Sequence, residues 1–187
     1  MKSLELIYLA GGCFWCTEAI FGQIKGVHEV VPGYMGGTKS NPSYQEVCVG
    51  TTNHAEVVQI SYDTRKTQLT DILFVFFNTH NPTTLNRQGN DIGTQYRSAI
   101  FFTSNQQKKV VDQVLKQLDE ENIFEDPIVT QVTKASTFYS AEDKHHQYYQ
   151  NNPQNSYCQF IIKPKLERLH EYFTAYIKKS VRQNLVK

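Results

Sequence analysis

The sequence predicts an α+β fold, a two-layer ferredoxin-like sandwich with an antiparallel sheet and a C-terminal extension. Short apolar stretches alternate with amphipathic ones in the order β-α-β-β-α-β, which is the order of the split β-α-β unit. A length of 187 residues with 40% hydrophobic content is enough for one core, and no linker divides the chain. We therefore expect a single domain over residues 1–187, with its core at about 4–165.

The first half of the chain supplies three of the strands and the first helix. Cys16, Ile20 and Ile24 recur every four residues, which predicts a helix that Gly26 ends. The long polar stretch between the second and third strands is a candidate functional loop. The expected elements are a strand over 4–10, a turn at Gly11-Gly12, a helix over 14–24, a strand over 27–32, a loop over 33–53 and a strand over 56–62.

The second half completes the unit and adds an extension. Ser104 or Asn105 can cap the second long helix, because both side chains accept hydrogen bonds from free helix amides. The expected elements are a helix over 68–79, a polar loop over 80–96, a strand over 98–103, a helix over 105–120, a strand over 128–133 and a C-terminal helix over about 164–181.

Charge and apolar patterning exclude several classes of protein. The formal net charge of +1 provides no field that would attract nucleic acid or an anionic membrane. Residues 1–6 have no signal-peptide pattern, and no apolar run is as long as a membrane span, so we expect a cytoplasmic protein. Four cysteines are too few for a disulfide scaffold in a chain of this length.

The segment Gly11-Gly12-Cys13-Phe14-Trp15-Cys16 is the strongest candidate for chemistry. A cysteine that leaves a strand through two glycines and opens a helix lies where the helix dipole favours a thiolate. Such sites lower a free pKa of about 8.5 to roughly 3.5–7.5. Cys13 is therefore the predicted nucleophile, and Cys16 lies one helical turn further on.

The Cys-x-x-Cys pair alone leaves more than one class of site open. Half of a zinc site is one alternative, but no second close cysteine or histidine pair at finger spacing accompanies it, and His145-His146 is expected to lie on a helix surface. A thioredoxin-type dithiol oxidoreductase fits the motif better. It does not account for four polar residues in loops at strand ends, where functional residues often lie: Tyr44, Glu56, Asp91 and Tyr96.

Together these segments resemble the A-class methionine sulfoxide reductases, over about Tyr8 to Lys165. The resemblance rests on 13–15, Tyr44, 54–56, 80–91 and 93–97. It implies that Cys13 attacks the sulfoxide sulphur, that Phe14 and Trp15 form the pocket for the methyl group, that Glu56, Tyr44 and Tyr96 face the oxygen, and that Asp91 helps to bind substrate.

The chemistry of a sulfoxide agrees with these implied roles. Its oxygen leaves only when protonated, so the site needs an acid that keeps its proton at neutral pH, and burial raises the pKa of a carboxyl group in that direction. Glu56 is the predicted proton donor. Tyr44 and Tyr96 can hydrogen-bond the oxygen as neutral phenols. His54 and Asn86 could support the site or serve only as structural caps.

A second thiol must condense with the sulfenic acid that this attack leaves on Cys13. Cys16 and Cys158 are the candidates, singly or in turn, whereas burial is expected for Cys48. A pair three residues apart on a regular helix needs local unwinding to form a disulfide. The resemblance implies thioredoxin as the reductant and selectivity for the S epimer, and we expect a monomer with no cofactor and no metal.

Overall fold

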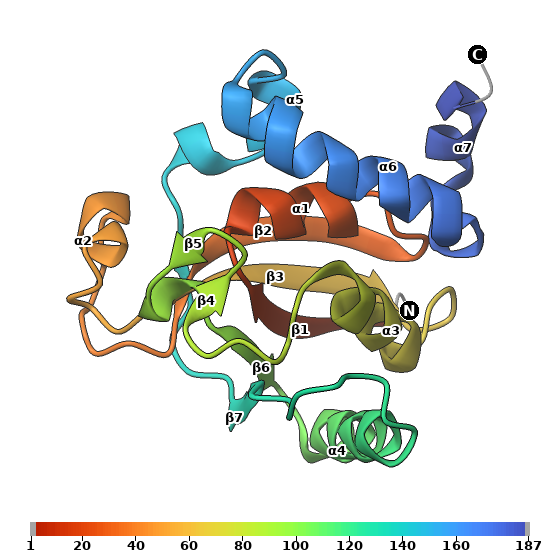
Figure 1. The fold of residues 1–187 in the computed structure, drawn as a ribbon, viewed down its shortest axis with the longest axis horizontal. Coiled ribbons are helices and arrows are strands. Elements are labelled where there is room, and N and C mark those ends of the chain that lie inside the picture. Colours follow the sequence, from red (N-terminus) through yellow and green to blue (C-terminus); the bar gives the residue numbers. More distant parts are fainter. Residues whose placement is uncertain (1–2, 186–187) are drawn as a thin grey trace.

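The computed structural model describes residues 3–185, and within them six strands form one sheet in the order β7-β6-β1-β3-β2-β8 (Figure 1). Every neighbouring pair is antiparallel except β6 and β7, which are parallel. Residues 1–2 and 186–187, which belong to the expected domain, lie outside the described residues. The strands are β1 (Leu4–Gly11), β2 (Val27–Met35), β3 (Ala55–Asp63), β6 (Ser98–Phe102), β7 (Gln131–Lys134) and β8 (Tyr139–Ser140).

Helices cover the sheet and cross over one another (Figure 1). Helix α1 lies against β2 and β3, and α6 crosses over α1 on the side away from the sheet, while α4 packs beside α3 at the opposite edge. The longer helices are α1 (Phe14–Phe21), α3 (Leu69–Thr79), α4 (Asn105–Glu120), α6 (Lys163–Tyr172) and α7 (Lys179–Leu185), and two short ones are α2 (Tyr44–Cys48) and α5 (Tyr148–Asn151).

Both faces of the central sheet are buried. Successive strand residues point to opposite faces, so Ile7 and Leu9 join the main core under the helices while Tyr8 and Ala10 join a smaller cluster on the other face. Phe138, in the segment that leads to β8, packs against this smaller cluster. The end of β1 that leads to Cys13 is thus fixed from both sides.

The predicted order of the first six elements is found as β1, α1, β2, β3, α3 and β6. Helix α4 has the predicted bounds, and the side chain of Ser104 caps it by accepting the amide of Gln107. Both polar loops contain short structure that the periodicity did not predict. Helix α2 interrupts the first, and the second forms a hairpin of β4 (Arg87–Gln88) and β5 (Asp91–Ile92) followed by a 3₁₀ turn over Thr94–Tyr96.

Four other predicted boundaries were wrong by three residues or more. Strand β2 continues to Met35 instead of ending at residue 32. Helix α1 ends at Phe21 instead of Ile24, and β7 begins at Gln131 instead of residue 128. The C-terminal helix predicted over about 164–181 is broken after Tyr172 and resumes at Lys179. The break and the early end of α1 have one cause, because Ile24 pairs with Ile177 as a β-bridge and the Lys178 amide donates to the Gln23 carbonyl.

Gly12 is required by the turn between β1 and α1. Its φ of +90° lies in the left-handed region, and a Cβ there would come within 2.6 Å of the Gln88 side chain. Gln88 cannot move away freely, because its amide group accepts from the Asn81 amide and donates to the Asn81 carbonyl. The hairpin region is therefore packed directly against the backbone before Cys13.

We expect Gly12→Ala to lower the free energy of unfolding by more than the ~1 kcal/mol that left-handed backbone strain alone produces. Gly89→Ala is the matched control, because Gly89 also has a positive φ (+60°) but no atom lies within 4 Å of its added Cβ. Urea unfolding of both variants measures the difference. Equal destabilisation would show that the contact with Gln88 relaxes without cost.

Candidate active site

Cys13 is the residue that opens α1. It lies at the N-cap with non-helical φ and ψ of −57° and 126°, and its carbonyl accepts hydrogen bonds from the Cys16 amide and the Thr17 hydroxyl, both at 3.1 Å. Its side chain is only 7% exposed. Cys13 thus lies directly before the regular helix that contains Cys16, and the need for local unwinding to join the two thiols stays a prediction.

The two thiols of this motif interact directly. Burial, a hydrogen bond with Cys16 and the nearby Glu56 raise the pKa of Cys13 well above its ordinary value. The same hydrogen bond lowers the pKa of Cys16 to about 7, against the effect of burial, and the charge of Lys165 adds to the lowering. The pair thus stabilises one thiolate and retains the other proton. The pKa of Cys13 therefore moves in the direction opposite to the predicted one, and burial is the largest cause.

Glu56 lies directly beside this motif at the start of β3. Its side chain is 1% exposed, and its Oε2 accepts the Phe14 amide at 2.9 Å. Burial raises the pKa of Glu56 to about 8, although the Phe14 hydrogen bond acts in the opposite direction. A buried carboxyl that keeps its proton at neutral pH is what the sequence predicted at this position.

Tyr44 and Tyr96 reach the same region from two different loops. Tyr44 opens α2 and Tyr96 ends the 3₁₀ turn before β6, and both side chains are half-buried. Burial is the main cause that raises the pKa of each phenol, and the nearby Glu56 contributes to both. Both groups are therefore neutral hydrogen-bonding groups at physiological pH.

Asp91 is connected to the dithiol motif through a residue that was not predicted. The Tyr157 hydroxyl donates to Asp91 Oδ2 at 2.8 Å and lies 3.8 Å from Cys16 Sγ. Burial and the surrounding acidic groups raise the pKa of Tyr157, so this hydroxyl stays protonated. Tyr157 precedes Cys158 in the chain, and this neighbourhood was the only signal in the sequence that could have indicated it.

Cys158 is fully buried at the start of a π-helix over Cys158–Ile162, rather than in the flexible segment that the sequence suggested. Cys13, Cys16 and Cys158 all belong to the main core cluster. Cys48 is half-buried near the hydroxyl of Tyr44, so its expected burial is only partial.

Aromatic rings surround the two predicted pocket residues. Phe14 is fully buried and stacks on Tyr44, and the half-buried Trp15 stacks on Tyr148 with ring centroids 3.7 Å apart and an angle of 6°. The imidazole of His145 lies among these rings, 4.2 Å from the Tyr44 ring centroid. His145 is 3% exposed, so its predicted position on a helix surface was wrong.

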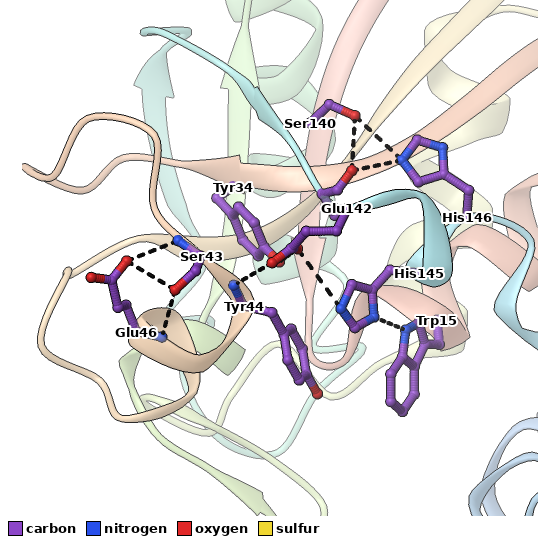
Figure 2. Close-up of polar contacts among 10 residues, drawn as sticks. Trp15, Tyr34, Ser43, Tyr44, Glu46, Ser140, Glu142, His145 and His146 are labelled. Atoms are coloured by element: carbon purple, nitrogen blue, oxygen red, sulfur yellow. Dashed lines mark hydrogen bonds and ion pairs between the residues drawn. The ribbon is translucent and has the colours of Figure 1, made fainter.

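Glu142 joins the separate segments around this aromatic group, as Figure 2 shows. Its carboxylate accepts the Tyr34 hydroxyl at 3.0 Å and the Tyr44 amide at 2.9 Å. His54, by contrast, has a structural role, because it accepts the Gly37 amide and contacts the Lys39 carbonyl. Asn86 adopts a left-handed turn conformation with φ of 49°.

The described part of the chain has neither a metal-binding cluster nor a membrane-spanning helix. Among residues 3–185, no group of three or more His, Cys, Asp or Glu side chains could hold a metal ion. In the same range, no helix is both long and apolar enough to span a membrane.

Comparison with known proteins gives extended matches. The family model described as peptide methionine sulfoxide reductase matches residues 5–177. The peptide methionine sulfoxide reductase MsrA of Polynucleobacter asymbioticus is 48% identical over 177 residues, which cover 95% of this chain and 93% of that protein. The MsrA of Trichodesmium erythraeum is 50% identical over 170 residues, covering 91% of this chain and 96% of its own length.

Solved structures agree with these matches. The reduced form of Mxr1 from Saccharomyces cerevisiae superimposes with a TM-score of 0.76 and 36% identity over 83% of this chain and 89% of that one.

We expect Glu56→Gln to change how stability depends on pH. With a folded pKa of about 8 against an ordinary 4.5, Glu56 keeps its proton in the folded protein while the unfolded chain loses it. The wild type should therefore lose stability as pH rises from about 5 to 8, by at most about 1.4 kcal/mol per pH unit. The variant should lack this loss. Urea unfolding at several pH values, with the exposed Glu29→Gln as control, measures it; parallel curves for wild type and Glu56→Gln would mean that Glu56 ionises normally.

Proposed function

The chain belongs to the peptide methionine sulfoxide reductase family and is an oxidoreductase, and from this premise we propose that it reduces methionine S-sulfoxide, free and in proteins, through Cys13. The observation that carries this mechanism is the buried Glu56 carboxyl, which is held against the first amide of α1 and keeps its proton at neutral pH. The biological role is repair of oxidised methionine.

In the first step, the Cys13 sulphur attacks the sulfoxide sulphur while Glu56 donates a proton to the oxygen. A protonated carboxyl has one acceptor oxygen and one O–H donor. Since Oε2 accepts the Phe14 amide, the proton can reside on Oε1 and be directed at the substrate. The sulfoxide oxygen then passes to Cys13 as a sulfenic acid, the thiol proton replaces the proton of Glu56, and methionine leaves.

Substrate recognition in this proposal uses the neutral groups around the thiol. The phenols of Tyr44 and Tyr96 hydrogen-bond the sulfoxide oxygen without adding charge. Phe14 and Trp15 enclose the methyl group, and Asp91 assists binding. The support is the arrangement of the rings, since Phe14 and Trp15 both stack on Tyr44.

The second step forms a disulfide and releases water. We propose that Cys16 resolves first, because it already hydrogen-bonds Cys13 and its pKa of about 7 favours a thiolate. Cys158 then attacks the Cys13–Cys16 disulfide at Cys16, which gives a Cys16–Cys158 disulfide and frees the Cys13 thiol. Burial raises the pKa of Cys158 and the charge of Cys16 adds to this, which is consistent with the proximity of the two thiols.

Thioredoxin is the proposed reductant, and it would reduce the disulfide by thiol exchange. The proposed enzyme is a monomer. The structural neighbour Mxr1 has also been crystallised in complex with Trx2.

We also assign the chain to the ferredoxin-like class as one domain. The support is the antiparallel strand order β6-β1-β3-β2 with α1 and α3 as the connecting helices.

We expect Glu56→Gln to lower kcat/KM for a methionine S-sulfoxide peptide by about 10²–10⁴-fold, the usual contribution of a general acid, with dithiothreitol as reductant. Alkylation of Cys13 by iodoacetamide should remain close to the wild-type rate. Cys13→Ser gives the zero level, Glu29→Gln the surface control and the R epimer the substrate control. Equal loss of sulfoxide reduction and of Cys13 alkylation would make Glu56 a structural residue. A dithiol oxidoreductase would be favoured if the wild type reduced no sulfoxide and Glu56→Gln still reduced insulin.

We expect the amount of methionine released per chain, measured without a reductant, to distinguish the roles of Cys16 and Cys158. The wild type should release a second equivalent of methionine per chain, because transfer of the disulfide to Cys158 restores the Cys13 thiol. Cys158→Ser should stop after the first equivalent with Cys13 and Cys16 joined, as identified by peptide mass spectrometry. Cys48→Ser is the matched control, and a second equivalent from Cys158→Ser would exclude the transfer.

A further inference from the structure

His145 contacts the indole edge of Trp15. The Trp15 Nε1–H donates to His145 Nδ1 at 3.2 Å, as Figure 2 shows. One face of the indole already stacks on Tyr148, which restrains the tilt of its plane. Stacking restrains the tilt of a ring but not its rotation within its own plane. A hydrogen bond at the edge supplies that second restraint.

The hydrogen bond defines the state of the imidazole. Because indole Nε1 is only a donor, Nδ1 of His145 has to be the acceptor and the proton of the neutral ring lies on Nε2. Among the described residues, Nε2 is buried without a hydrogen-bond partner, and the nearest acid is Glu142, with Oε2 at 3.8 Å. Burial lowers the pKa of His145, which agrees with a neutral ring at pH 7.

Glu142 fixes the other side of the imidazole. Its two oxygens accept the Tyr34 hydroxyl and the Tyr44 amide, so the carboxylate is attached to β2 and to the first residue of α2. The Tyr44 ring lies against His145 on the same side. The imidazole of His145 therefore contacts both Trp15 and Tyr44, the two rings that the proposed function places on the methyl group and on the oxygen of one substrate (Figure 2).

We propose that His145 is a positioning residue for the sulfoxide, which sets the in-plane orientation of Trp15 and its spacing from Tyr44. The inference rests on the proposed function, because the oriented indole is the wall of the methyl pocket. His145 itself transfers no proton. It acts on substrate binding by keeping the indole in one rotational position.

The test compares two substitutions of nearly equal shape, His145→Asn and His145→Leu. The Asn side-chain oxygen can take the place of Nδ1 as acceptor, whereas Leu removes the acceptor and leaves the indole N–H buried without one. The chain contains one tryptophan, so its indole ¹H–¹⁵N resonance reports on Trp15 alone. His28→Leu, at an exposed residue of β2, controls for loss of a histidine.

We expect the indole resonance of His145→Leu to move upfield and its proton to exchange faster, with KM for a methionine S-sulfoxide peptide raised about tenfold and kcat less affected. His145→Asn should restore both readouts toward the wild type. Unchanged KM in His145→Leu with a shifted resonance would overturn the inference while the wild-type activity upholds the proposed function. Absence of wild-type turnover would instead defeat the proposed function, and this inference with it.

The wild type also provides a test that does not depend on a variant that folds. Long-range ¹H–¹⁵N spectra distinguish the two neutral forms of a histidine ring. We expect the Nε2–H form for His145 at pH 7. The Nδ1–H form, or a doubly protonated ring, would be incompatible with acceptance of the indole proton and would overturn the inference.

Discussion

The hydrogen bond from the Phe14 amide to the Glu56 carboxyl joins the start of α1 to the start of β3, and the arrangement around the thiols depends on it. Helix N-termini leave amides without partners, so a buried terminus needs an acceptor. Glu56 provides one, and the surrounding packing excludes the water that would otherwise stabilise its charge. One contact therefore satisfies the helix and places a proton beside Cys13.

Burial is the largest cause of the raised pKa values around Cys13. The same exclusion of water raises the pKa of Cys13, Tyr44, Tyr96 and Glu56. These four groups are therefore neutral in the free protein, which suits a polar but uncharged substrate. Cys16 is the exception, because a thiol hydrogen bond and Lys165 favour its thiolate.

Local patterns in the sequence were sufficient for the elements whose residues interact with near neighbours. The four-residue recurrence from Cys16 and the cap at Ser104 are of this kind, and α1 and α4 are found where they predict helices. Contacts between distant segments were not predictable. His145 lies 130 residues after Trp15, and Tyr157 66 residues after Asp91, so neither partnership leaves a local pattern. The pairing of Ile24 with Ile177, which breaks the C-terminal helix, was not predicted because it also joins distant segments.

The π-helix that contains Cys158 bears on how other thiols can reach this residue. Its thiol is fully buried, so a cycle in which Cys158 exchanges with other thiols requires this five-residue segment to open. π-Helices are rare and often found at functional sites, and deletion of one residue would restore regular α-helical bonding. In the proposed cycle through Cys158, such a deletion would favour the closed segment over the open one. In the proposed cycle, the opening of this segment and the stability of the fold therefore make opposite demands on the same five residues.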